Sequence, residues 1–176
     1  MTNYRELITI AVCCALFSGC NRSEPVNLQH TVEEPKPLAS VLRVNDPSIS
    51  GQLLSGFGAV EANSWRWVGP NFAVALGVPP GIAASGASVV LDFSLPDASV
   101  KILKRLTISG RVGGATLSPE TYDTPGAHKY QREIPASALK ADNLEVQFNV
   151  DKFIGPSEVD RRQLSLVVSS IQLQPK

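Results

Sequence analysis

The feature of this sequence that most constrains its fold is a two-residue alternation of apolar with small or polar side chains. It recurs in four segments, 72–78, 89–95, 106–112 and 144–150. A period of two places the apolar side chains on one face of an extended strand, so each segment is predicted to be a half-buried strand. Gly and Pro turn signals separate the segments, and only residues 135–139 are typical of a helical turn. Many short strands without βαβ alternation predict an all-β fold, an antiparallel β-sandwich.

The last apolar stretch, residues 164–173, changes phase in its middle. Leu164, Leu166 and Val168 hold one phase, and Ile171 and Leu173 hold the other. Ser169 and Ser170 lie between the two phases. An extra residue in one strand of an antiparallel pair has this effect, so we predict a β-bulge at these serines.

The N-terminus carries a targeting signal. Residues 7–17 form an uncharged, mostly apolar run that is too short to span a bilayer as a helix and has the length of a signal-peptide core. It ends in Leu-Phe-Ser-Gly-Cys at residues 16–20, which resembles the lipobox of bacterial lipoproteins. The resemblance implies a diacylglyceryl thioether on the Cys20 thiol, cleavage before this residue, and a lipid anchor that contains palmitate. It also implies attachment to the bacterial envelope, and Asn21 favours the outer membrane over the inner one.

Cysteine usage agrees with this interpretation. Cys13 and Cys14 would leave with the signal, so the mature chain would keep Cys20 alone, and an exported domain with one thiol has no disulfide framework. The sequence thus predicts a signal peptide over 1–19, a lipidated Cys with a Pro-rich tether over 20–40, and a β-sandwich domain over 41–176.

Charge and residue content exclude several function classes. Lys+Arg and Asp+Glu both number 16, and this zero net charge excludes a nucleic-acid partner, which needs a basic face. The two histidines are His30, in the tether, and His128, with no Gly-x-Ser-x-Gly motif. Metal-ligand spacing is also absent, and no motif indicates a structural Ca²⁺. We therefore expect a protein that is not an enzyme and that has no metal and no cofactor.

The most informative side-chain cluster is Trp65-Arg66-Trp67 with Glu61. In a strand the two indoles point to the same face. If that face is exposed, they form a platform on which the apolar faces of sugar rings stack. The alternative is that one or both indoles fill the core, as large aromatic side chains usually do, with Trp67 as the first candidate.

Charged residues near this cluster have two interpretations as well. Glu61 and Arg66 are candidates for a structural ion pair, which Arg161 or Arg162 could complete. The Asp160-Arg161-Arg162 run would then hold the start of the last strand. The alternative is that the guanidinium groups bind an acidic or diol-bearing sugar bidentately.

The body of the chain resembles galactose-binding-like jelly-roll domains of bacterial cell-surface and polysaccharide-related proteins. The resemblance covers about residues 50–174. It depends on Gly56-Phe57, Glu61 and Trp65–Trp67, then on an Ile-Pro-x-x-x-Leu segment and on Asp160–Leu164, and Ser165 stands where the pattern has Gly. The resemblance implies a jelly-roll β-sandwich that binds glycans or acts as an accessory module.

Two functions are consistent with these observations. The first is a lipid-anchored envelope protein with a non-catalytic binding module for glycan. The second is a structural or assembly lipoprotein that contacts another envelope protein through a sheet face or edge. An exposed indole in a groove favours the first, and an exposed apolar patch without a groove favours the second.

Overall fold

The computed structural model describes residues 37–176. The described residues all belong to one compact unit, Lys36–Lys176. The predicted signal peptide, Cys20 and the tether up to residue 36 lie outside the described residues. Within residues 37–176, none of the helices has the length and apolar character needed to cross a membrane.

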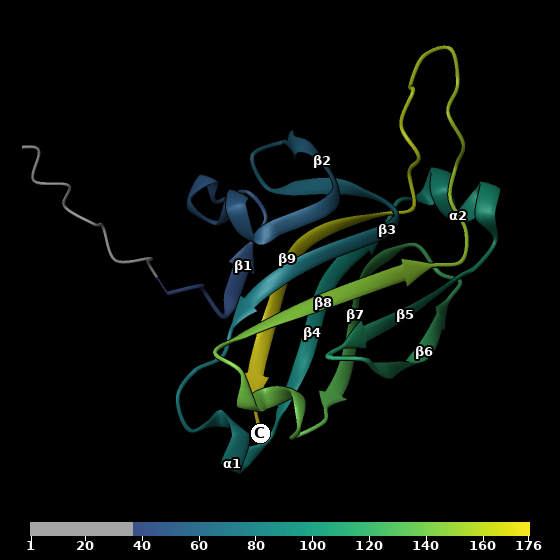
Figure 1. Cartoon of the computed structure of the whole chain (residues 1–176). Coiled ribbons are helices and arrows are strands. Elements are labelled where there is room, and N and C mark those ends of the chain that lie inside the picture. Colours follow the sequence, from purple (N-terminus) through teal and green to yellow (C-terminus); the bar gives the residue numbers. More distant parts are fainter. Residues whose placement is uncertain (1–36) are drawn as a thin grey trace, which may run out of the picture. The chain divides into compact units, whose positions relative to one another are not determined.

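Strands dominate the described chain, with short helices between them (Figure 1). The strands are β1 (Val41–Arg43), β2 (Leu53–Glu61), β3 (Trp65–Gly77), β4 (Ala87–Leu95), β5 (Leu106–Val112), β6 (Ala115–Tyr122), β7 (Gly126–Ile134), β8 (Asn143–Val150) and β9 (Leu166–Pro175). The helices are the 3-10 helices η1 (Pro47–Gln52) and η2 (Ala138–Lys140) and the α-helices α1 (Ile82–Ser85) and α2 (Asp97–Leu103).

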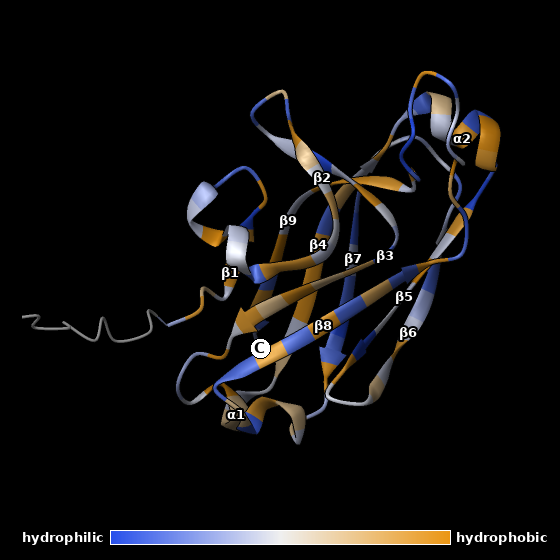
Figure 2. Ribbon diagram, turned by 45° about the horizontal axis from the view of Figure 1, so that its top comes forward, coloured by the Kyte–Doolittle hydropathy of each residue, from blue (hydrophilic) through white to orange (hydrophobic). Residues whose placement is uncertain are grey.

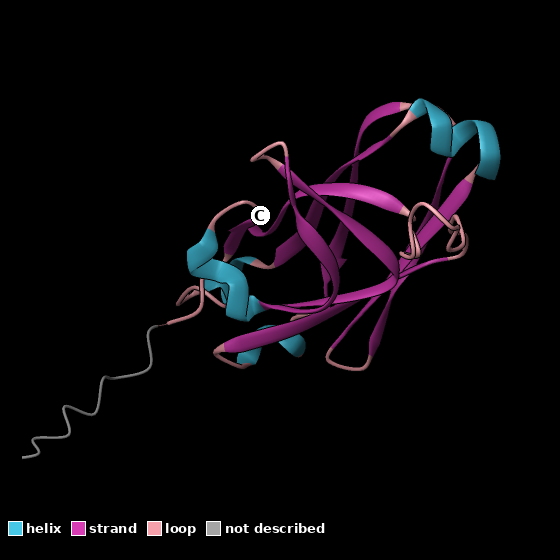
Figure 3. Ribbon diagram, turned by 90° about the horizontal axis from the view of Figure 1, so that it is seen from above, coloured by secondary structure: helices cyan, strands magenta, loops and turns pink. Residues whose placement is uncertain are grey.

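All pairings between these strands are antiparallel. The strand order is β6-β5-β8-β3-β9-β4-β7, with β1 beside β9 and β2 beside β3. The sheet folds over on itself, so that β6, β5, β8 and β3 face β9, β4 and β7 across the interior (Figures 1 and 3). The predicted all-β, jelly-roll-like antiparallel sandwich is confirmed.

Strand β3 contributes to both layers. Its first part, Arg66–Val68, pairs with β9, and its later part, Asn71–Gly77, pairs with β8. Gly69 and Pro70 separate the two parts. Because proline has no N–H to donate to a neighbouring strand, the ladder is interrupted there and the strand can pass from one layer to the other.

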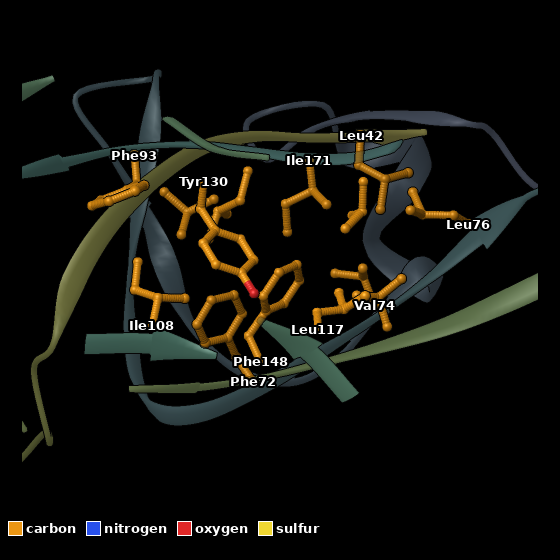
Figure 4. Packing of buried hydrophobic residues seen from close by; sticks show 14 of the residues in the cluster. Leu42, Phe72, Val74, Leu76, Phe93, Ile108, Leu117, Tyr130, Phe148 and Ile171 are labelled. Atoms are coloured by element: carbon orange, nitrogen blue, oxygen red, sulfur yellow. The ribbon is translucent and has the colours of Figure 1, made fainter. Parts of the chain in front are cut away.

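The core lies between the layers and receives side chains from both (Figure 4). Phe72 stacks on Phe148 with ring centroids 4.9 Å apart, and Tyr130 from the other layer meets Phe148 edge-on at 6.3 Å. Along β8 exposed and buried residues alternate without exception, as the two-residue period predicted. The same alternation is visible as blue and orange bands on β8 in Figure 2.

Side chains, not a backbone ladder, join the two ends of the sheet. Tyr130 Oη and Arg132 Nε both donate to the carbonyl oxygen of Ser118, at 2.9 and 2.7 Å, so that β7 is tied to β6. Arg132 also forms an ion pair with Glu120 at 2.7 Å, and its guanidinium lies 4.6 Å from the centre of the Tyr130 ring. Burial raises the pKa of Tyr130 to about 12. The hydroxyl therefore stays protonated and keeps donating to the Ser118 carbonyl.

The bulge predicted in the last strand is present. Asp92 pairs with Ser170 and Phe93 pairs with Val168, which leaves Ser169 as the extra residue of β9. Val168 and Ile171 are fully buried, whereas both serines lie outside the core. The phase change in the sequence thus corresponds to two consecutive outward-facing residues.

The folded domain begins before the predicted boundary at residue 41. The backbone N–H of Ala39 donates to the side chain of Gln52, and the N–H of Gly77 donates to the Ala39 carbonyl at 3.0 Å. Leu173 N–H donates to the carbonyl of Ser40 at 2.8 Å. Ala39 and Ser40, assigned to the tether by their Pro-rich surroundings, are therefore hydrogen-bonded to the sandwich.

Candidate functional site

Polar side chains gather on the outer face of the β8 layer. The strict alternation of β8 turns Glu145, Gln147 and Asn149 away from the core. Asn71 of β3 pairs with Asn149 in register, and Arg111 of β5 pairs with Gln147. Because neighbouring residues across a ladder point to the same face, these side chains form one surface.

The strand registers order this surface into a row that crosses five strands. Thr116 pairs with Arg111, Arg111 with Gln147, Gln147 with Ala73, and Ala73 with Ser55. At a strand spacing of about 4.8 Å, the row is about 19 Å long. A second, shorter row beside it consists of Ser109, Asn149 and Asn71. We call this surface the polar groove.

The polar groove is hollow where its side chains are short. Ala73, the fourth of the five residues in the longer row, has only a methyl group and lies between Gln147 and Ser55. The resulting hollow has a volume of about 420 Å³, and Phe72 and Phe148, whose rings point into the core, are among the residues at its floor.

Hydrogen bonds within the polar groove orient its side chains. Asn149 Nδ2 donates to Asn71 Oδ1 at 2.8 Å, and Gln147 Nε2 donates to Glu145 Oε1 at 2.8 Å. Each amide keeps further donors or acceptors for a ligand, since a primary amide has two N–H groups and a carbonyl oxygen. Glu145 and Arg111 balance each other in formal charge, so the groove as a whole is neutral.

A second hollow adjoins the polar groove at Asn71, which lines both. It has a volume of about 360 Å³ and is lined by Trp67 of β3, Phe57 of β2 and Arg162 of the loop before β9. We call it the tryptophan hollow. Trp67 is half-buried there and is absent from the buried core.

The two indoles do not form the flat platform that their spacing suggested. Trp65 and Trp67 meet edge to face, with centroids 6.3 Å apart and planes at 87°. Both are half-buried, and the core beneath them is occupied by Val68 instead. The alternative prediction, that an indole fills the core, is wrong, because the side chain of Val68 takes the inward position on this part of β3. Trp67 alone of the pair lines a hollow.

Glu61 forms an ion pair with Arg162 and not with Arg66. The Arg162 guanidinium contacts Glu61 Oε1 at 2.7 Å and Asp160 Oδ2 at 2.8 Å. Its hydrogen bonds hold the pKa of Asp160 at about 2, and the two carboxylates raise the pKa of Arg162. The guanidinium therefore joins the loop before β9 to β2.

The Arg66 guanidinium is hydrogen-bonded to the backbone of two neighbouring segments. Its Nε donates to the carbonyl of Val44 at 2.7 Å, and its Nη1 donates to the carbonyl of Gly58 at 2.8 Å. The predicted ion pair between Glu61 and Arg66 is thus wrong, because backbone carbonyls of neighbouring segments take the guanidinium. Arg161 is exposed and makes no hydrogen bond or ion pair with any residue in 37–176.

No metal-binding cluster accompanies these hollows in the described part of the chain. Residues 37–176 contain no group of three His, Cys, Asp or Glu side chains placed to hold a metal ion. His128 bonds through Nε2 to the carbonyl oxygen of Thr124 and stacks on Phe93, within the β4–β7 pair.

The residues of the polar groove were not singled out by the sequence. Asn71, Gln147 and Asn149 occupy the wet positions of predicted strands, where any polar residue is expected. The one signal in the sequence was the residue type at these three positions, which are all amides. Strand order and register were needed to bring them together.

Comparisons with known proteins found similarity in structure but none in sequence families. The sequence matches no protein-family model and no curated protein. Eighteen solved chains are similar in structure. One is the CBM36-1 domain of a multidomain xylanase from the hindgut metagenome of Trinervitermes trinervoides, with 11% identity and a TM-score of 0.43, covering 77% of this chain and 96% of that one.

Two further structures have lower TM-scores. A structure described as CBM4 has 11% identity and a TM-score of 0.33, covering 77% of this chain and 85% of its own. Dimeric latent PorU from Porphyromonas gingivalis has 9% identity and a TM-score of 0.34, covering 70% of this chain and 14% of its own. Because the sequence identities and the TM-scores are this low, the function proposed below depends on the polar groove alone.

Proposed function

We propose that residues 39–176 form a non-catalytic binding module for a glycan chain, which lies along the polar groove. The observation that carries the proposal is the longer row, in which Thr116, Arg111, Gln147 and Ser55 supply hydroxyl, guanidinium and amide groups from β6, β5, β8 and β2, while β3 contributes the amide of Asn71 in the shorter row. Sugar hydroxyls both donate and accept hydrogen bonds, and amide and hydroxyl side chains do the same. The groove is open along its length, which suits a chain better than a compact cofactor.

The tryptophan hollow extends this site. Asn71 lines both hollows, so a chain that leaves the shorter polar row at Asn71 reaches Trp67. An indole face stacks on the apolar face of a sugar ring. The aromatic side chain then contributes to the affinity for the sugar, and the polar groups beside it fix the orientation of the sugar. Arg162 lines the same hollow, but its guanidinium already has two carboxylate partners. We therefore assign it a supporting role for the hollow wall.

A glycan array followed by calorimetry tests this function. We expect Gln147→Ala and Asn71→Ala to weaken the affinity for an array hit at least tenfold, because each removes groove hydrogen bonds. The matched control is Gln131→Ala, an exposed amide on β7 outside both hollows, which should leave affinity unchanged. Failure of every glycan to bind would overturn the proposal and favour the assembly alternative.

The second part of the proposal concerns location. We propose that the mature chain begins at a lipidated Cys20 and holds the module at the bacterial envelope, on the outer membrane. The lipobox-like run at residues 16–20 and the lack of any other cysteine after residue 14 support it. Mass spectrometry of the N-terminal peptide from membranes tests it. An unmodified Cys20 or cleavage elsewhere would contradict lipidation and leave the glycan site unaffected.

A further inference from the structure

The outer face of the other layer carries a hollow that shares no residue with the polar groove. It has a volume of about 470 Å³ and lies over β1, β9 and β4. The side chains that carry its chemistry are those of Arg43, Asn45, Asp92, Ser169, Ser170 and Gln172. We call it the bulge hollow, because the two serines are those of the β9 bulge. The core lies between this layer and the β8 layer (Figure 4).

The bulge supplies two hydroxyl groups at one place. In a regular strand, consecutive side chains point to opposite faces, so one of two adjacent serines would enter the core. Here Ser170 Oγ donates to Asp92 Oδ2 at 2.8 Å, and Ser169 Oγ donates to the Asp92 carbonyl at 3.1 Å. Both hydroxyls are thus held by Asp92, that of Ser170 by its carboxylate and that of Ser169 by its backbone carbonyl, and bulges often re-aim side chains at functional sites.

One row of paired residues across β1, β9, β4 and β7 carries both positive and negative side chains at the bulge hollow. Arg43 pairs with Ser170, Ser170 with Asp92, and Asp92 with Lys129. Lys129 Nζ lies 3.8 Å from Asp92 Oδ1, so this carboxylate has a cation on its β7 side. The Arg43 guanidinium is exposed and makes no hydrogen bond or ion pair within residues 37–176. One unpaired cation, Arg43, and the Lys129-paired carboxylate of Asp92 therefore lie on either side of Ser170.

We propose that the bulge hollow binds a carboxylated sugar residue of an acidic glycan, at a site separate from the polar groove. The sugar carboxylate pairs bidentately with Arg43, since the guanidinium fork matches a carboxylate. Ring hydroxyls donate to Asp92 and bond to the amides of Asn45 and Gln172. A monoanionic carboxylate suits the site better than a phosphate dianion, because Asp92 repels the larger charge more strongly.

Titration of the domain with tetragalacturonate, by calorimetry and by amide chemical shifts, tests this site. We expect shifts at Ser169 and Ser170, and at least tenfold weaker affinity in Arg43→Gln and Ser170→Ala. The carboxyl-reduced, neutral tetrasaccharide and inorganic phosphate should each bind at least tenfold more weakly than tetragalacturonate. Arg161→Gln removes one exposed positive charge elsewhere and is the matched control, with affinity expected to stay within twofold.

The outcomes separate this site from the glycan module proposed above. Gln147→Ala should leave tetragalacturonate affinity unchanged, because the two hollows share no residue. Equal binding of the acidic and neutral tetrasaccharides, no effect of Arg43→Gln, or no binding of tetragalacturonate would each overturn the carboxylate site. A loss caused by Gln147→Ala alone would place the acidic sugar in the polar groove and overturn it as well.

Discussion

The side-chain amide of Gln52 forms two hydrogen bonds with the backbone of Ala39. Gln52 Oε1 accepts from the Ala39 N–H at 2.9 Å, and Nε2 donates to the Ala39 carbonyl at 2.9 Å. Nε2 also donates to the carbonyl of Ala75 at 2.7 Å, and the side chain is buried. One amide thereby joins the segment before β1 to β3.

Gln52→Leu should lower the free energy of unfolding by about 2–3 kcal/mol, because three part-buried backbone groups, two of Ala39 and one of Ala75, each lose a hydrogen bond. Urea denaturation measures it. Gln131→Leu, on the exposed face of β7, should change the free energy by less than about 0.5 kcal/mol. A chain that starts at Val41 should also be less stable than one that starts at Pro37. Equal stability of these two chains would contradict the role assigned to Ala39.

The carboxyl group of Asp160 should titrate near pH 2 in the native protein, which NMR titration would show. In Arg162→Ala its pKa should return to about 4, because the hydrogen bonds that hold it low are lost. A lowered pKa favours the folded loop above about pH 4, and this contribution disappears as the pH falls through 2. An Asp160 pKa that is the same in both proteins would contradict the pairing.

Trp67→Ala and Trp65→Ala should each lower the free energy of unfolding by only about 1–2 kcal/mol, because neither indole is in the core. Phe72→Ala, which removes a fully buried ring, should cost about 3–5 kcal/mol and is the control. Denaturation midpoints compare the three. If Trp67→Ala lowered the free energy of unfolding as much as Phe72→Ala does, the Trp67 indole would have to be part of the core.

Ser165→Ala should leave stability unchanged or raise it by up to about 1 kcal/mol. Ser165 Oγ is fully buried and is the one buried side-chain oxygen or nitrogen in residues 37–176 without a hydrogen-bond partner. Removing a buried, unpaired hydroxyl removes its desolvation cost. Calorimetric melting measures the change. A lower melting temperature would show that this hydroxyl has a partner, such as a buried water.

Stability should decline as the pH rises from about 10 through 12. Burial raises the pKa of Tyr130 to about 12 and also raises that of Tyr122, so the folded state favours the neutral phenols. Their contribution is complete below pH 10 and is lost as the pH passes the folded-state pKa. In Tyr130→Phe the decline in melting temperature over this range should be smaller. An identical decline in both proteins would contradict the role of this hydroxyl.

Five of the nine strands in residues 37–176, β3, β4, β5, β8 and β9, were predicted because period two is a local signal. Strands β1, β2, β6 and β7 were not, because their apolar residues do not alternate regularly with polar ones. The alternation over 144–150 predicted β8, and the phase change at Ser169 predicted the bulge. Helix α2, Asp97–Leu103, was missed because seven residues make fewer than two full turns, too few to show a helical period. The pairing of Glu61 with Arg162 was weighed as one of several, since charge complementarity alone selects no partner.

What the sequence determined by itself is where the regularly alternating strands lie and which side of each of them faces the core. Only the tertiary structure decided which strands are neighbours and in what register. Asn71 and Asn149 are 78 residues apart in the chain and form one hydrogen bond, and Arg43 and Asp92 flank the same residue of β9. Hydrophobic alternation specifies a buried face but not a neighbour, because every such strand buries the same kind of face. The polar groove and the bulge hollow therefore both depend on the order of the strands in the sheet.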